Sequence, residues 1–168
     1  SNDFGNGSDT NDLKVTAANV LIKNRDTFEL GASTVSGTYT VTAVTGNITD
    51  SGTLAITGLA TLNTSASNAT ITLDETGSTF AAGVSLNTTG SSGNATVDTG
   101  TNALIVATSS VGGNLTLTSG NASGITDLVG ATVTVNGNLS ATTDANNGVI
   151  TLDGLAVDTD GGSTIAFA

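Results

Sequence analysis

Two carboxylates stand two residues apart at Asp158 and Asp160, the spacing at which an acid and a base could act together. On a strand both would face the same side, roughly 7 Å apart, which is a separation that glycosidase carboxylates can have. The remaining parts of such a site are scarce, because only 3% of the chain is aromatic and no Lys or Arg follows residue 25. We therefore expect these carboxylates to lie in a surface turn, and we expect no enzyme.

The composition excludes several other kinds of site. The chain has no His and no Cys, which removes zinc sites, disulfides and every Ser-His-Asp or Cys-His nucleophile. A net charge of −11 with three basic residues excludes a nucleic-acid partner, which needs phosphate neutralisation. No apolar run approaches the length of a membrane-spanning helix, so we expect no membrane insertion. No Lys/Arg-led apolar stretch opens the chain, so we expect no signal peptide in it.

Calcium is the alternative to having no cofactor. Repetitive β-helices that bind Ca²⁺ use Gly-Gly-x-Gly-x-Asp nonapeptides. The runs Asp160-Gly161-Gly162 and Val111-Gly112-Gly113 lack the rest of that pattern. We expect no cofactor and no metal site, and incidental Ca²⁺ binding by Asp and carbonyl oxygens stays open.

Asn and Thr are unusually frequent, with 17 Asn and 33 Thr, and they form two kinds of motif. Thr-x-Thr occurs at 38/40, 40/42, 70/72, 116/118 and 132/134. Ladders of Thr can bind ice, but these pairs have no fixed spacing, so we interpret Thr as a strand residue. Asn-x-Ser/Thr sequons occur at Asn6 and at eight later candidate glycosylation sites: Asn47, Asn63, Asn68, Asn87, Asn94, Asn114, Asn121 and Asn138. The alternative is that Asn sits in turns and Thr in the strands that follow.

A pair of apolar residues separated by one polar residue recurs along the whole chain. Such period-two pairs predict short strands with one buried face. Turn-forming Gly, Asn, Asp and Ser fill the gaps, and no segment has helical apolar spacing. The pairs are Leu13/Val15, Val20/Ile22, Phe28/Leu30, Tyr39/Val41, Leu54/Ile56, Ala60/Leu62, Ile71/Leu73, Val84/Leu86, Ala95/Val97, Leu104/Val106, Leu115/Leu117, Val133/Val135, Ile150/Leu152, Leu155/Val157 and Ile165/Phe167.

The chain also repeats itself over a longer distance. A shift of about 76 residues places Phe28, Val35 and Val41 on Leu104, Val111 and Leu117. A slightly longer shift, of about 79 residues, places Ile71 on Ile150. Such self-similarity is typical of stacked repeats rather than of hairpins. We interpret residues 1–168 as one segment of two repeats, about 1–77 and 78–156, with a partial coil at 157–168.

A shorter step of about 19 residues separates Val20 from Tyr39, and four such steps make one repeat. A coil of that length holds three short strands and three turns. We therefore predict an all-β fold, a right-handed parallel β-helix with about 19 residues per coil and about eight to nine coils. Its thin core would be filled by Val, Leu, Ile and Ala, and the absence of Pro preserves the ladder donors.

The runs Asn2-Asp3-Phe4-Gly5, Leu30-Gly31-Ala32-Ser33-Thr34-Val35-Ser36-Gly37 and Tyr39-Thr40-Val41-Thr42-Ala43 resemble the repeats of filamentous haemagglutinin and other two-partner-secreted exoproteins. Gly46-Asn47-Ile48-Thr49, Leu54–Gly58 and Ala69–Asp74 continue the resemblance, and the second repeat carries it more weakly. The resemblance implies a right-handed β-helical shaft of a secreted adhesin. The family's Asn-Pro-Asn-Gly secretion motif is missing here, so the resemblance is to the shaft alone.

We therefore expect a structural shaft or fibre segment of a large bacterial surface exoprotein, secreted and displayed outside the cell. Its partners would be neighbouring repeats of the same or identical chains, and a host-cell or glycan receptor. We expect the segment to be cut from a longer repetitive chain, because we see no polar cap for either end. Two alternatives remain, a surface-layer or sheath subunit with Ca²⁺-assisted lateral contacts, and a carbohydrate-binding adhesin surface.

Overall fold

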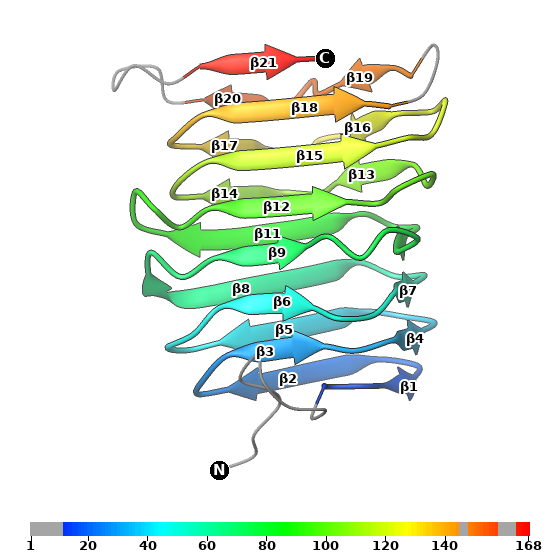
Figure 1. The fold of residues 1–168 in the computed structure, drawn as a ribbon, viewed down its shortest axis with the longest axis vertical. Helices are drawn as coiled ribbons and strands as arrows, with labels where there is room; N and C mark the ends of the chain where they lie inside the picture. The colour runs from blue at the N-terminus through cyan, green and yellow to red at the C-terminus, as the bar shows by residue number, and fades with distance from the viewer. Residues whose placement is uncertain (1–11, 145–147, 158–163) are drawn as a thin grey trace.

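The computed structural model describes residues 12–144, 148–157 and 164–168 of the chain. Within these ranges the chain forms short strands and no helix, and the strands wind as a stack of coils (Figure 1). Every strand pair among the described residues is parallel. The prediction of an all-β parallel solenoid is therefore confirmed. Asn136-Gly137, which could have closed an antiparallel hairpin, instead joins β17 (Val133–Val135) to β18 (Leu139–Thr143) in one coil.

Three sheets run along the stack, and we name them by their place in Figure 1. The front sheet contains β3 (Phe28–Leu30), β6 (Ile48–Asp50), β9 (Ile71–Leu73), β12 (Ala95–Asp98), β15 (Leu115–Ser119), β18 and β21 (Ile165–Phe167). The side sheet contains β1 (Thr16–Ala17), β4 (Ser33–Val35), β7 (Leu54–Ile56) and β10 (Thr79–Phe80).

The rear sheet changes its form halfway along the stack. Its lower part contains β2 (Val20–Asn24), β5 (Tyr39–Ala43), β8 (Ala60–Ser67) and β11 (Val84–Thr89). Above β11 the sheet divides, because β11 pairs with both of the short strands that follow it on this side. One branch contains β13 (Leu104–Val106), β16 (Ile125–Asp127) and β19 (Ile150–Thr151), and the other contains β14 (Ser109–Val111), β17 and β20 (Leu155–Val157).

The seven strands of the front sheet mark about six turns of the solenoid, fewer than the eight to nine predicted. The predicted coil length holds for some coils, such as the first, where the hydrogen bond from the Thr38 N–H to Asn19 Oδ1 spans 19 residues, and a middle one, where the bond from the Asn114 N–H to Asn94 Oδ1 spans 20. Near the other end of the stack, the bond from the Thr164 N–H to Asn138 Oδ1 spans 26 residues. The coils vary in length because their turns differ in length, while the strands of successive coils stay paired.

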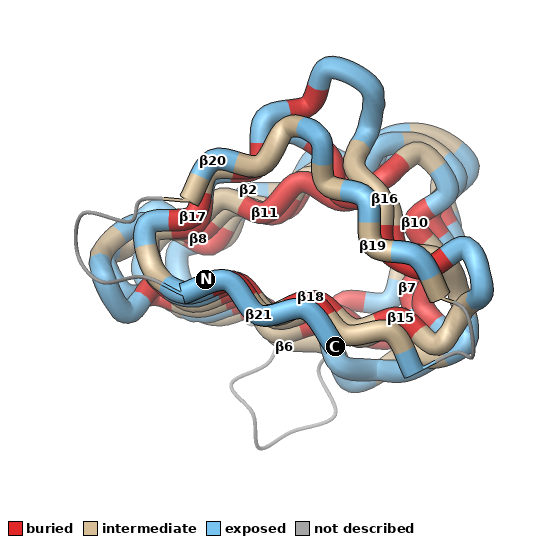
Figure 2. Tube along the Cα trace, turned by 90° about the horizontal axis from the view of Figure 1, so that it is seen from above, coloured by how far each residue is buried: buried red, intermediate tan, exposed pale blue. Residues whose placement is uncertain are grey.

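The core is a continuous column of aliphatic side chains. Val41, Leu62 and Leu86 lie in register on β5, β8 and β11, and all are 0% exposed. Tyr39 is also completely buried, as its place in an apolar pair predicted. Seen along the stack, buried residues lie mainly in the strands, while exposed ones gather at the turns (Figure 2). Each coil therefore buries its apolar side chains between the coils below and above it.

Candidate functional site

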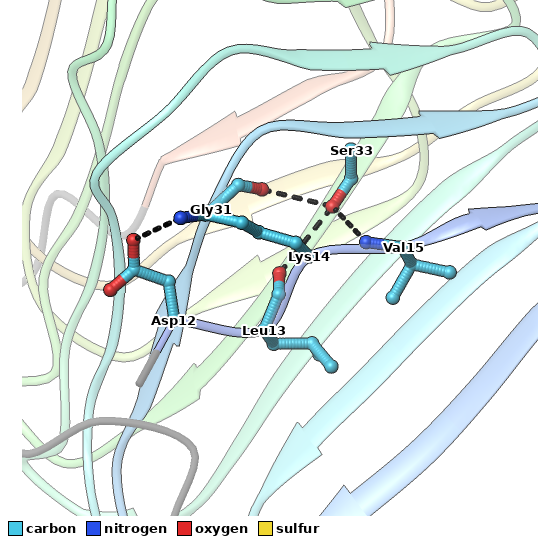
Figure 3. A network of polar contacts seen from close by, with 6 residues as sticks. All are labelled: Asp12, Leu13, Lys14, Val15, Gly31 and Ser33. Atoms are coloured by element: carbon cyan, nitrogen blue, oxygen red, sulfur yellow. Dashed lines mark hydrogen bonds and ion pairs between the residues drawn. The ribbon is translucent and has the colours of Figure 1, made fainter. Parts of the chain in front are cut away.

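Buried serine hydroxyls connect the coils at the corners between strands. Ser33 on β4 is 4% exposed. Its Oγ accepts a hydrogen bond from the Val15 N–H (3.0 Å) and donates one to the Gly31 carbonyl (2.9 Å) (Figure 3). The Lys14 side chain lies over Gly31, with its Nζ 3.5 Å from Asp12 Oδ2. The hydroxyl thus satisfies an amide of the coil below that would otherwise be buried without a partner.

Ser109 and Ser78 use their hydroxyl groups in the same way. Ser109 on β14 accepts from the Leu86 N–H (3.0 Å) and donates to the Ala107 carbonyl (2.8 Å). Ser78 accepts from the Leu54 N–H (3.0 Å) and donates within its own turn. These serines occupy core positions without breaking the stack, because both hydrogen-bonding capacities of the hydroxyl are used.

A column of asparagines marks the corner where the chain enters the front sheet. Asn94, Asn114 and Asn138 each immediately precede a front strand. The side-chain Oδ1 of each accepts from the backbone N–H of the equivalent residue one coil later, at 2.8 Å in all three cases. Asn47 bonds the Thr70 N–H in the same way, at 2.9 Å. The asparagines therefore join consecutive coils through side chain and backbone.

The second residue of five consecutive front strands, from β6 to β18, forms a ladder of hydroxyls that points outward. Thr49, Thr72, Thr96, Thr116 and Ser140 are in register on consecutive strands. The Thr-x-Thr pairs have no fixed spacing in the sequence, yet the structure brings Thr72 and Thr116 from two of them into one ladder. The sequence separations between these residues are unequal, so turns of different length conceal a regular ladder with the usual spacing of about 4.8 Å between strands.

The rear sheet carries a second polar ladder, built on amides. Asn87 Nδ2 donates to Asn63 Oδ1 (3.0 Å) and to Ser85 Oγ (3.2 Å), and Asn63 Nδ2 donates to Thr42 Oγ1 (3.3 Å). These bonds cross three successive coils on β5, β8 and β11. The side-chain nitrogens of both asparagines are therefore already engaged in the folded protein.

The structure separates the predicted glycosylation sites into two groups. Asn63, Asn87 and Asn121 donate from Nδ2, the nitrogen that a glycan would occupy. The second group, in which the oxygen is the bonded atom, contains Asn47, Asn68, Asn94, Asn114 and Asn138. Asn6 lies outside the described residues. The sequon excess has a structural origin, because a corner Asn and an outward Thr or Ser two residues later belong to two neighbouring ladders.

We expect an oligosaccharyltransferase acting on the folded chain to modify Asn47, Asn114 and Asn138, which are exposed, and to leave Asn63 and Asn87 unmodified. The first three keep their nitrogen at the surface of a turn, whereas the other two are half-buried within strands. Peptide mass spectrometry after the reaction measures the occupancy. The unfolded chain is the control and should be modified at all five. Equal occupancy of the two groups in the folded chain would contradict the assignment.

Asp50 is a carboxylate at a position that the coil normally gives to an apolar residue. It pairs in register with Leu30, which is completely buried. Its Oδ1 accepts from the backbone N–H of Asp74 (2.9 Å) and of Glu75 (3.4 Å), while Oδ2 is buried without a hydrogen-bond partner. Burial raises the pKa of Asp50 to about 6, and the nearby Asp74 and Glu75 carboxylates add to the increase against the two backbone bonds.

Because the folded protein holds the Asp50 proton more tightly than the unfolded chain, this group favours folding below pH 4. We expect that contribution to disappear as the pH rises from about 4 to about 6. The free energy of unfolding then falls by ~1–2 kcal/mol, a value reduced because Asp50 is partly exposed to solvent. Asp50→Asn keeps the accepting Oδ1 and removes the step. Urea unfolding at pH 4, 5, 6 and 7 measures it, with the exposed Asp144→Asn as control. A wild-type step that survives in Asp50→Asn would exclude this carboxylate as its source.

A groove of about 480 Å³ lies on the rear side of the stack. Leu59, Ser85 and Asn87 form its floor with neighbouring residues, and the loop 128–131 forms a wall with Val129 fully exposed. The loop between β16 and β17 is longer than the corresponding loop between β6 and β7 in the first repeat. The groove therefore lies between the two repeats, with Leu59, Ser85 and Asn87 from the first and the loop 128–131 from the second.

Asp158, Asp160 and the Asp160-Gly161-Gly162 run lie outside the described residues. Within residues 12–144, 148–157 and 164–168, no group of three or more acidic side chains is placed to hold a metal ion. In the same ranges, no helix has the length and hydropathy needed to cross a bilayer.

The fold and these surface ladders define a parallel β-solenoid whose coils are joined by serine and asparagine contacts. The chain belongs to the family described as repeats of unknown function (DUF5649), which matches residues 17–87 and 92–166. No curated protein and no solved structure matches the chain.

The family repeat and the coil contain different numbers of strands. The first family match begins at the last residue of β1 and the second begins three residues before β12. They end within β11 and β21, so the ten strands β2–β11 correspond to the ten strands β12–β21. A coil has three strands, so one repeat is three coils and one further strand. The second repeat is therefore rotated by a third of a turn against the first. Accordingly, the five-residue β5 on the rear sheet corresponds to the five-residue β15 on the front sheet.

Proposed function

We propose that this chain is a segment of a rigid extracellular shaft, which spaces a distal region of a large bacterial surface exoprotein away from the cell. The observation that carries the proposal is the unbroken stacking across the boundary between the two repeats. β12, the first strand of the second repeat, pairs directly with β9 of the first, and β14 pairs with β11. A repeat that stacks on its neighbour without a linker lengthens one column, which is the property that a spacer needs.

The winding belongs to the same proposal, and we take it to be right-handed. As the chain rises in Figure 1, the near strands run from left to right and the far strands from right to left. This direction supports a right-handed path, and right-handed crossovers are strongly preferred between parallel strands. The resemblance to filamentous haemagglutinin repeats supports the same winding, the secreted location and the role as shaft.

The distribution of charge and of aromatic residues supports a spacer over a glycan-binding surface. Net charge is −11, which keeps neighbouring shafts soluble through repulsion. Tyr39 and Phe80 are 0% and 2% exposed, so neither offers a platform for a sugar ring. Phe167 is exposed, but it belongs to β21, the last strand of the front sheet.

Antibodies raised against the folded chain test this function on the organism that produces it. We expect labelling of intact, unpermeabilised cells, and we expect deletion of the two repeats from the gene to bring the distal part of the protein closer to the cell surface in electron micrographs. Labelling that appears only after permeabilisation would contradict the proposal. Binding of the purified chain on a glycan array would favour the adhesin surface instead, and disassembly by a chelator would favour a surface layer.

A further inference from the structure

The last coil of the solenoid presents core positions that nothing covers among the described residues. Ile165 and Phe167 on β21 pair in register with Leu139 and Ala141, which are 1% and 0% exposed. Ile165 and Phe167 are themselves 46% and 56% exposed. Figure 2 shows β21 as an exposed strand above a coil whose inner positions are buried. These two side chains occupy inward positions of the column without a further coil above them.

The first repeat shows what the same positions look like when they are covered. In the alignment of the two repeats, Leu86 on β11 corresponds to Ile165, and Ile71 on β9 corresponds to Ile150. Leu86 and Ile71 are 0% exposed. Ile150 on β19 is only half-buried. The two repeats thus contain the same apolar end, buried in the first and uncovered in the second.

The boundary inside the chain identifies what covers this end. Ile71 pairs with Ala95 of β12, the first strand of the second repeat. Asn87, next to Leu86, pairs with Ser110 of β14, the third strand of that repeat. The beginning of one repeat is therefore complementary in register and in apolar residues to the end of another.

We propose that the end of the stack formed by β19, β20 and β21 is a docking surface for a further unit of this same repeat. The first strand of the incoming unit pairs with β19 and its third strand pairs with β21. The interaction reproduces the internal boundary, including its rotation by a third of a turn. The proposal deepens the proposed shaft function and rests on it, since it names the partner and the strand register by which the shaft extends.

The rotation has a consequence for any partner that binds the side of the shaft. The long strands lie at the rear in the first repeat and at the front in the second. An equivalent side returns to the same direction only after three repeats, which are ten coils or ~48 Å of stack. The equivalent surfaces thus follow a helical path around the shaft, and a partner that recognises one of them meets it on every side in turn.

The absence of Cys allows a direct test by engineered disulfides. The full chain is extended after residue 168 by a second copy of residues 90–166, and Cys is introduced by Ala166→Cys and by Ser110→Cys in the added copy. Ala166 corresponds to Asn87, so the proposal places these two residues opposite each other on neighbouring strands. Neighbouring parallel strands lie ~4.8 Å apart, within the Cα range of a disulfide.

The matched control is the original chain with Asn87→Cys and Ser110→Cys, a pair that lies in register in the structure. A second control pairs Ala166→Cys with Ser123→Cys in the added copy, at an exposed turn. We expect the extended chain to oxidise as completely as the internal pair. Oxidation no higher than with the turn residue would overturn the proposal.

Amide hydrogen exchange gives a second readout that needs no cysteine. We expect the amides of residues 165–167 to exchange at least tenfold more slowly in the extended chain than in the original one. Unchanged exchange would overturn the proposal even if the cysteine variants failed to fold. A negative result in the disulfide test or in the exchange test would not alter the labelling of intact cells. Failure of the docking proposal can therefore be distinguished from failure of the proposed shaft function.

Discussion

Substitution of Leu62 by alanine is expected to lower the free energy of unfolding by about 2–5 kcal/mol. Leu62 is 0% exposed and lies in the middle of the column, in register with Val41 below and Leu86 above. A cavity at this level removes contacts to both neighbouring coils, and a thin core has few other side chains that can move into the space. Urea unfolding followed by circular dichroism measures the loss.

The matched control is Thr61→Ala, one residue away on β8, where the side chain faces outward and is half-buried. We expect this change to alter the free energy of unfolding by less than about 0.5 kcal/mol. Equal losses in the two variants would mean that position 62 does not lie on the inner side of the coil. That result would contradict the inward and outward alternation on which the column depends.

Substitution of Ser109 by alanine is the second large effect, and we expect a loss of about 1–3 kcal/mol. The change removes less volume than Leu62→Ala, but it leaves the buried Leu86 N–H without an acceptor and the Ala107 carbonyl without this donor. A buried amide that loses its partner costs its full desolvation energy. Thermal and urea unfolding measure the effect.

Ser110→Ala is the control for this prediction, because Ser110 is the next residue of β14 and is exposed. We expect it to be nearly neutral. A loss for Ser109→Ala no larger than for Ser110→Ala would show that the hydroxyl does not join the coils. Ser33 and Ser78 would then need another explanation for their burial.

Most strands are readable from the sequence because an apolar pair marks the two inward positions. The strands that this pattern missed include those in which one inward residue is polar. β4 and β14 use Ser33 and Ser109, and β6 ends in Asp50. These polar residues are tolerated inside because each is bonded to the backbone, which apolar periodicity cannot reveal.

The length of the coil was harder to predict than its strands. The short step from Val20 to Tyr39 is real and nearly returns between Ala95 and Leu115, but most other coils gain residues in their turns. Turn length costs little free energy, so a solenoid can vary it while its ladders stay in register. The hydroxyl ladder was missed for the same reason, although Asn-x-Thr at Asn94 and Asn114 was a local signal for it, with Asn at the corner and Thr on the strand.

X-ray scattering from chains containing two, four and six tandem repeats addresses the stacked column most directly. Ten strands per repeat and three per coil give about 3.3 coils, or ~16 Å of added length per repeat at ~4.8 Å per coil. We predict that the length grows by this amount while the cross-section stays constant. Separate compact particles joined by linkers, or a cross-section that grows with repeat number, would contradict a single continuous shaft.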